Sequence, residues 1–222
     1  MSMMRPASWS SAHQQDPTTD LLLLRHGETP LTPERRFSGT GSSDPGLSEV
    51  GLRQAQQAAR SAVVRLAGPT VVLTSPLRRC RETADVVAAA LGVTVEVLED
   101  LREMDFGEWE GHTFAEVRQR HPDDLAAWKR SADVAPTGSR ESFTELLHRV
   151  GDVARNLSRA HPGATVLAVT HVTPVKAFVA HALDAPATSF FAMELSPAAL
   201  TRISYTGEEA VLRSFNDTSH LR

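Results

Sequence analysis

The sequence predicts a three-layer α/β/α domain whose central sheet is mostly parallel and has an antiparallel edge. Strand-like and helix-like segments alternate along the chain, short apolar runs are typical of strands buried on both faces, and two alternating segments around Thr206-Gly207 predict a closing hairpin. The 222 residues, 41% of them hydrophobic and 23% charged, have the composition and length of one globular domain. We expect residues 20–222 to form it, after a polar, disordered leader over 1–19.

Four short segments predict the parallel strands, because each is apolar or rich in β-branched residues and ends in polar or turn-forming residues. In chain order they are residues 21–25, 70–74, 93–98 and 165–170. The hairpin is expected to pair residues 200–205 with 210–215.

Helical spacing of apolar residues and terminal signals predict the helices between these strands. Ser48 is a candidate N-cap, Gly92 a candidate C-cap, and Ser142 with Glu145 forms a capping box that opens a long helix. Pro174 falls in the first turn of the last one. The predicted helices span residues 48–66, 77–91, 113–120, 122–130, 142–159 and 174–183.

Polar side chains gather where the four predicted parallel strands end. Arg25-His26 follows the first strand, Arg79 the second, Glu103 the third, and His171 the fourth. The carboxyl ends of parallel strands share one edge of the sheet, which is where open α/β sheets bind ligands. We therefore expect these side chains to converge in one pocket.

This set of side chains suits phosphoryl transfer without a metal. Arginine forks match phosphate oxygens, a neutral histidine can attack phosphorus, and a carboxylic acid can protonate the departing oxygen. The sequence has no P-loop, and its only cysteine, Cys80, excludes intrachain disulfides and cysteine-based zinc sites. We expect no metal and no cofactor. The net charge of −4 gives no global basic surface for nucleic acid.

Five motifs in order, between residue 20 and about residue 175, resemble those of the histidine phosphatase superfamily, the phosphoglycerate-mutase-like proteins. They are LLLLRHGET, FSGTGSSDPGLSEVGLRQA, TSPLRRCRETA, LREMDFGEWEG and VTH. Within it, FGEWEGHTFAEV, THVTPVK and the ending NDTSHL are most similar to alpha-ribazole phosphatases and to the acid phosphatase domain of bifunctional ribonuclease H–phosphatase proteins. A stand-alone relative and a domain cut from a longer protein both stay open. The resemblance implies a phosphoglycerate-mutase-like fold.

The resemblance implies a role for each matching residue. His26 would be the phosphorylated nucleophile, Glu103 the proton donor and His171 the second catalytic histidine, and four further residues would bind the phosphate: Arg25, Arg79, Ser38 and Gly39. Asp105 stays open as a rival to Glu103. Two positions depart from the family pattern: Val172 follows His171 where glycine is frequent, and Thr32 stands where mutase-type members have asparagine.

The predicted function is hydrolysis of small phosphate monoesters through a phosphohistidine, with alpha-ribazole 5′-phosphate or a broad acid phosphatase range as candidate substrates. Phosphoglycerate-mutase-type transfer and a non-enzymatic phospho-ligand binder are the alternatives. Residues 30–45 and 104–141 are expected to set selectivity. We expect a small-molecule partner, no nucleic acid, no membrane and, by default, a cytoplasmic location; a homodimer stays open.

Overall fold

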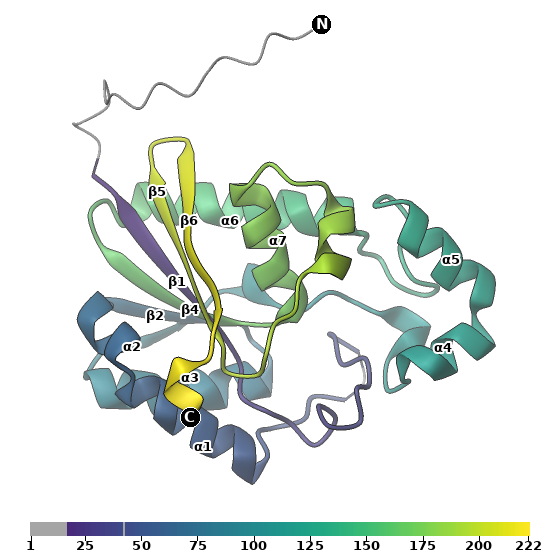
Figure 1. Ribbon diagram of the computed structural model, residues 1–222, viewed down its shortest axis with the longest axis horizontal. Coiled ribbons are helices and arrows are strands. Elements are labelled where there is room, and N and C mark those ends of the chain that lie inside the picture. Colours follow the sequence, from purple (N-terminus) through teal and green to yellow (C-terminus); the bar gives the residue numbers. More distant parts are fainter. Residues whose placement is uncertain (1–16, 42) are drawn as a thin grey trace, which may run out of the picture.

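The computed structural model describes residues 17–41 and 43–222. Its centre is a six-stranded sheet in the order β3-β2-β4-β1-β5-β6, with helices on both faces (Figure 1). The strands from β3 to β1 are parallel, and β5 and β6 form the antiparallel edge, so the predicted α/β architecture is confirmed. The strands are β1 Thr19–Arg25, β2 Val71–Thr74, β3 Val95–Val97, β4 Thr165–Thr170, β5 Leu200–Thr206 and β6 Glu209–Asp217.

The run Leu21–Leu24 is apolar throughout because β1 lies in the middle of the sheet and faces a helical layer on each side. Leu21 and Leu23 pack into the cluster that contains α6 (Phe143–Ala160) and α7 (Val172–Ala182). Leu22 and Leu24 pack into the cluster that contains α1 (Glu49–Arg60), α2 (Ala62–Ala67) and α3 (Arg78–Leu91). All four leucines are at most 1% exposed. Continuous apolarity thus marks burial on both faces.

The seven α-helices of the described residues follow the predicted order, with two differences. The prediction of a single helix over 48–66 is wrong. Ser61 has extended backbone, and its side chain accepts a hydrogen bond from the Val64 amide, so the first helix ends there and a second helix begins. The last predicted helix begins earlier, at Val172 rather than Pro174. The helices are α1 Glu49–Arg60, α2 Ala62–Ala67, α3 Arg78–Leu91, α4 Phe114–Arg120, α5 Pro122–Arg130, α6 Phe143–Ala160 and α7 Val172–Ala182.

The predicted capping signals hold where the structure describes them. Ser142 and Glu145 form a reciprocal capping box at the start of α6, and Gly92 ends α3 in left-handed backbone. Most of the predicted leader, residues 1–16, lies outside the described residues, and Thr19 already belongs to β1.

Helices α4 and α5 stand apart from the two layers, at the right of Figure 1. They belong to the long connection between β3 and α6, and side chains from them help to line the cavity described below. None of the described helices has the length and apolar character needed to cross a membrane.

Candidate active site

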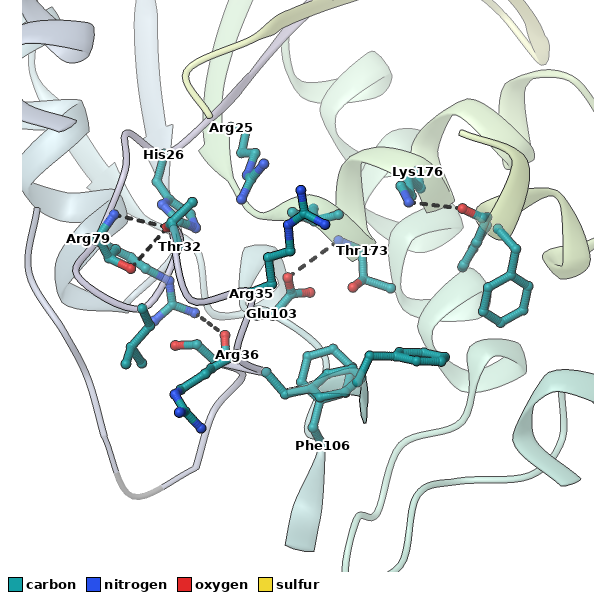
Figure 2. A pocket seen from close by; sticks show the side chains of 18 of the residues that line it. Arg25, His26, Thr32, Arg35, Arg36, Arg79, Glu103, Phe106, Thr173 and Lys176 are labelled. Atoms are coloured by element: carbon teal, nitrogen blue, oxygen red, sulfur yellow. Dashed lines mark hydrogen bonds between the residues drawn. The ribbon is translucent and has the colours of Figure 1, made fainter. Parts of the chain in front are cut away.

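A cavity of about 560 Å³ lies where the parallel strands end (Figure 2). Its wall includes Arg25 and His26 at the end of β1, Arg79 in the first turn of α3, and Glu103 beyond β3. The structure therefore brings the five expected side chains together, since the ring centre of His171 lies 5.2 Å from that of His26, and four of the five line the cavity. The fifth, His171, is fully buried and does not line the cavity.

The surroundings of His26 fix which ring nitrogen can act as a nucleophile. Its Nδ1 lies 2.7 Å from the carbonyl oxygen of Gly27, and because a carbonyl only accepts, Nδ1 carries the proton. Burial, with the positive charges of Arg79 and Arg25, holds the pKa of His26 well below its ordinary value. The ring is therefore neutral and keeps a lone pair on Nε2.

Gly27 is required by close packing beneath this loop. A Cβ at Gly27 would lie 2.4 Å from the carbonyl oxygen of Gly51 in α1, and a Cβ at Gly51 would lie 2.0 Å from the carbonyl oxygen of Glu28. Neither separation is possible between real atoms, so both positions need glycine. The pair lets the chain after β1 turn against α1 and fixes the position of His26.

His171 lies behind Arg79 and orients it. Arg79 Nε donates to His171 Nδ1 at 3.2 Å, so the proton of the neutral ring is on Nε2, which donates to Ser75 Oγ at 2.7 Å. Burial and the charge of Arg79 hold the pKa of His171 well below its ordinary value. Both ring nitrogens are engaged with protein groups, an arrangement suited to positioning Arg79.

Arg25 and Arg79 bring two guanidinium groups to the cavity wall. Arg79 Nη2 donates to the carbonyl oxygens of Ser38 and Gly39, and Arg25 Nη1 donates to that of Leu195 at 2.6 Å. Arg79 Nη1 and Arg25 Nε are buried with no hydrogen-bond partner among the described residues. Burial lowers the pKa of Arg25 to about 10, so it stays charged at neutral pH. Arg79 Nη1 does form an ion pair, since it lies 3.7 Å from Asp44 Oδ1. Two charged guanidinium groups at one cavity wall suit phosphate oxygens.

Glu103 lies in the cavity wall, whereas its rival Asp105 does not. Glu103 lines the cavity, and burial raises the pKa of its carboxyl. Its oxygens accept from the amides of Met104 at 2.8 Å and Thr173 at 3.4 Å. The carboxylate of Asp105 instead accepts from loop amides outside the cavity wall, those of Gly107 and Arg140.

Ser38 and Gly39 occupy the loop that closes over Arg79. Ser38 is among the residues that line the cavity and Gly39 is not, and the Gly39 amide donates to Glu110. A Cβ at Gly39 would lie 2.1 Å from the carbonyl oxygen of Met104, so this position also needs glycine. Their contribution is made through backbone carbonyls that hold Arg79.

A family profile described as the histidine phosphatase superfamily (branch 1) matches residues 21–218. The chain belongs to the histidine phosphatase superfamily. The predicted family and the predicted class of enzyme, a phosphatase, are thereby confirmed.

Among the relatives of this histidine phosphatase chain is a bifunctional protein of Mycobacterium tuberculosis, which is 42% identical over 204 residues. That match covers 91% of this chain and 55% of the relative, so the chain spans about half the length of the curated relatives it matches first.

Two solved structures share the fold of this histidine phosphatase. A phosphoserine phosphatase of Entamoeba histolytica in complex with phosphoserine superposes with a TM-score of 0.81 and 26% identity, covering 92% of this chain and 100% of its own. The alpha-ribazole phosphatase of Shigella flexneri gives a TM-score of 0.76 and 27% identity, covering 89% and 96%.

The sequence interpretation missed much of the cavity wall of this histidine phosphatase. Thr173 and Lys176 come from α7, and Lys176 Nζ donates to the carbonyl oxygen of Phe190 at 2.9 Å. Val172 continues directly into α7 with ordinary backbone, which confirms that no glycine is needed after His171. Other lining residues, such as Arg35 and Trp128, fall within the ranges 30–45 and 104–141 that were expected to set selectivity. Thr173 and Lys176 stand in the THVTPVK motif but had been given no role.

Arg35 is held at the cavity in a strained backbone conformation. Its φ of 55° is left-handed, which is uncommon for a residue with a long side chain. The turn is closed by bonds from the Arg35 amide to the Thr32 carbonyl and from the Thr29 amide to Thr32 Oγ1. Figure 2 shows the Arg35 side chain extending into the cavity toward Arg25 and Thr173. Strain kept at a cavity wall indicates a functional position.

We expect Arg35→Gly to weaken substrate binding without destabilising the protein. Glycine relieves left-handed strain of about 1–2 kcal/mol, which offsets its larger loss of chain entropy. The KM for phosphate esters should rise by about 3–10-fold, since one exposed charge contact is lost. Thermal unfolding and steady-state kinetics measure the two effects. Asp184→Gly is the matched control, because Asp184 also has positive φ (50°) but lies outside the cavity wall.

Proposed function

We propose that the chain is a metal-independent phosphomonoester hydrolase that works through a phosphohistidine at His26. The observation that carries the proposal is the neutral His26 ring, with Nδ1–H fixed on the Gly27 carbonyl and Nε2 free, beside the buried guanidinium groups of Arg25 and Arg79. Glu103, a carboxyl with a raised pKa, supplies the acid in the same cavity.

In the first step the phosphoryl group binds between the guanidinium groups of Arg25 and Arg79, which neutralise its charge. His26 Nε2 attacks phosphorus, and a P–N bond forms as the bond from phosphorus to the ester oxygen breaks. The departing oxygen keeps the bonding electron pair and takes the proton from Glu103. The products are an alcohol and a phosphohistidine.

In the second step the Glu103 carboxylate accepts a proton from water as the water oxygen attacks phosphorus. The P–N bond breaks, its electron pair returns to Nε2, and inorganic phosphate leaves. His171 acts through Arg79 in both steps: its Nδ1 holds Arg79 Nε, while Ser75 fixes the opposite side of the ring. We assign His171 as a positioning residue.

The expected alternatives predict different products from one assay. Incubation with a phosphate monoester should release inorganic phosphate and free alcohol in equal amounts. A mutase would return the phosphoryl group to another oxygen and release little phosphate, and a binding protein would release none. A binder has no need of an acid, so the raised pKa of the Glu103 carboxyl supports hydrolysis.

The substrate proposed here is a small phosphate ester. The relatives act on or bind phosphoserine and alpha-ribazole phosphate according to their names, so both belong in a substrate screen beside broad acid phosphatase substrates such as p-nitrophenyl phosphate. Ranking kcat/KM over such a panel identifies which phosphate esters this chain hydrolyses best.

We expect EDTA to leave the rate of hydrolysis unchanged. Positive charge at the phosphoryl site comes from Arg25 and Arg79, which do the work that metal ions do in many other phosphoryl-transfer enzymes. Among the described residues, no three His, Cys, Asp or Glu side chains are grouped so that they could hold a metal ion. A rate lost on chelation and restored by Mg²⁺ or Zn²⁺ would contradict the proposal.

A further inference from the structure

The part of the cavity wall that lies away from Arg25 and Arg79 is rich in aromatic side chains. Six of the eight phenylalanines of the chain line this one cavity, together with Trp128, although aromatic residues make up only 5% of the sequence. They come from five separate segments: the 30–41 loop, the loop after Glu103, α4–α5, the start of α6 and the 3₁₀ turn Ala187–Ala192. The six phenylalanines are Phe37, Phe106, Phe114, Phe143, Phe190 and Phe191.

The rings form one connected layer. Phe37 contacts Phe106 with ring centres 4.9 Å apart, and Trp128 contacts Phe143 at 4.6 Å and Phe191 at 5.2 Å. The fully buried Trp109 joins the two groups, since it lies 5.6 Å from Phe37 and 5.2 Å from Trp128. A layer tied together in this way presents a rigid apolar surface.

Part of this layer is left open to the cavity and to solvent. Phe191 is 47% exposed and Phe114 is 38% exposed, whereas Trp109 beneath them is inaccessible. Large apolar rings left partly uncovered beside polar catalytic groups are typical of ligand sites. The charged groups that bind phosphate lie at the other end: in Figure 2, Phe106 is on the far side of Glu103 from Arg25 and His26.

We propose that this aromatic wall, defined as Phe106, Phe114, Trp128, Phe143, Phe190 and Phe191, binds the alcohol part of the substrate, and that the preferred substrates are phosphate monoesters of alcohols that carry a flat, apolar ring. The inference rests on the proposed function and names the substrate class for the same site. An ester held by its phosphate at Arg25 and Arg79 directs its alcohol past Glu103, toward the wall. Small polar alcohols such as serine leave the rings uncovered.

The test compares two esters whose alcohol oxygens have similar basicity, 2-phenylethyl phosphate and ethyl phosphate. Burying one phenyl ring predicts a kcat/KM higher by about 30-fold or more for the phenylethyl ester. Phe191→Ala and Phe114→Ala should each lower that advantage by about 3–10-fold. Both side chains are partly exposed, so their removal leaves the core intact.

Phe215→Ala is the matched control, because Phe215 is half-buried on the edge strand β6 and does not line the cavity. It should keep the full preference for the phenylethyl ester. Equal kcat/KM for the two esters in an active wild-type enzyme, or a preference for phosphoserine over both, overturns the inference and leaves the proposed function standing. Release of phosphate from no ester, p-nitrophenyl phosphate included, overturns the proposed function instead.

Binding without turnover gives a second readout. 2-Phenylethylphosphonate has no ester bond to cleave, and Trp128 lies in the wall it would contact. Titration into the wild-type protein should change tryptophan fluorescence with a Kd lower by about 30-fold than for ethylphosphonate. Phe191→Ala should remove most of that difference. Equal affinities for the two phosphonates count against the aromatic wall as a binding surface.

Discussion

His26→Ala is expected to lower kcat by about 10³–10⁶-fold while the protein keeps its fold, because the variant has no nitrogen to carry the phosphoryl group. The side chain faces an open cavity, so alanine leaves no closed void behind it. Far-ultraviolet circular dichroism and thermal unfolding check the fold, and release of inorganic phosphate checks the rate.

A second measurement on the same variant separates the nucleophile from a general loss of activity. Wild-type protein stopped with denaturant during turnover should carry one acid-labile phosphoryl group on the peptide that contains His26. The alanine variant should carry none. His148→Ala is the matched control, because His148 is exposed and lies outside the cavity wall, and it should keep both the rate and the label. A well-folded His26→Ala protein with near-normal turnover would contradict the mechanism.

Glu103→Gln is expected to lower kcat/KM for alkyl phosphates by about 10²–10⁴-fold and to lower it far less for p-nitrophenyl phosphate. An alkoxide leaves poorly without a proton, whereas p-nitrophenolate is stable enough to leave without one. Comparing kcat/KM for two substrates on one variant cancels any loss of folded protein. Equal losses on both esters would make Glu103 structural, and Asp105→Asn then tests the remaining carboxyl.

Comparing Glu103→Gln with the wild type also tests in which direction activity changes with pH. Burial raises the pKa of the Glu103 carboxyl, so its protonated form persists to a higher pH than an exposed glutamate allows. Activity on alkyl phosphates should therefore fall as pH rises through that raised pKa. Because the pKa of His26 is lowered, its ring stays neutral even at pH values below the ordinary pKa of histidine. Glu103→Gln should lose the alkaline fall that the wild type shows, because glutamine does not titrate.

The fold was predictable from sequence because its signals are local. Leu21–Leu24 are apolar in every position because the strand is buried on both faces, and Ser142 with Glu145 marks a helix start by the bonds it makes. The break at Ser61 was missed because serine is tolerated inside a helix as well as at its cap, and apolar spacing continues through it.

The candidate site was only partly predictable. His26, Arg79 and Glu103 each follow a strand, so topology alone brings them to one cavity. The position of His171 behind Arg79 depends on side-chain packing, which strand order does not determine. The aromatic wall was located only in part: Phe106 falls within the range 104–141 that was expected to set selectivity, whereas Phe191 lies far from it along the chain.

The order of the sheet also bears on how activity returns after denaturation. The cavity takes residues that follow the four parallel strands β1, β2, β3 and β4, and neighbours in the sheet such as Leu22 and Leu167 are widely separated along the chain. Parallel pairs of this kind close long loops and form slowly. A refolding intermediate with only α3 and β2 formed would hold Arg79 without His26. Enzymatic activity should therefore reappear with the slowest folding phase, after most helical signal has recovered, so that regain of turnover reports completion of the central sheet.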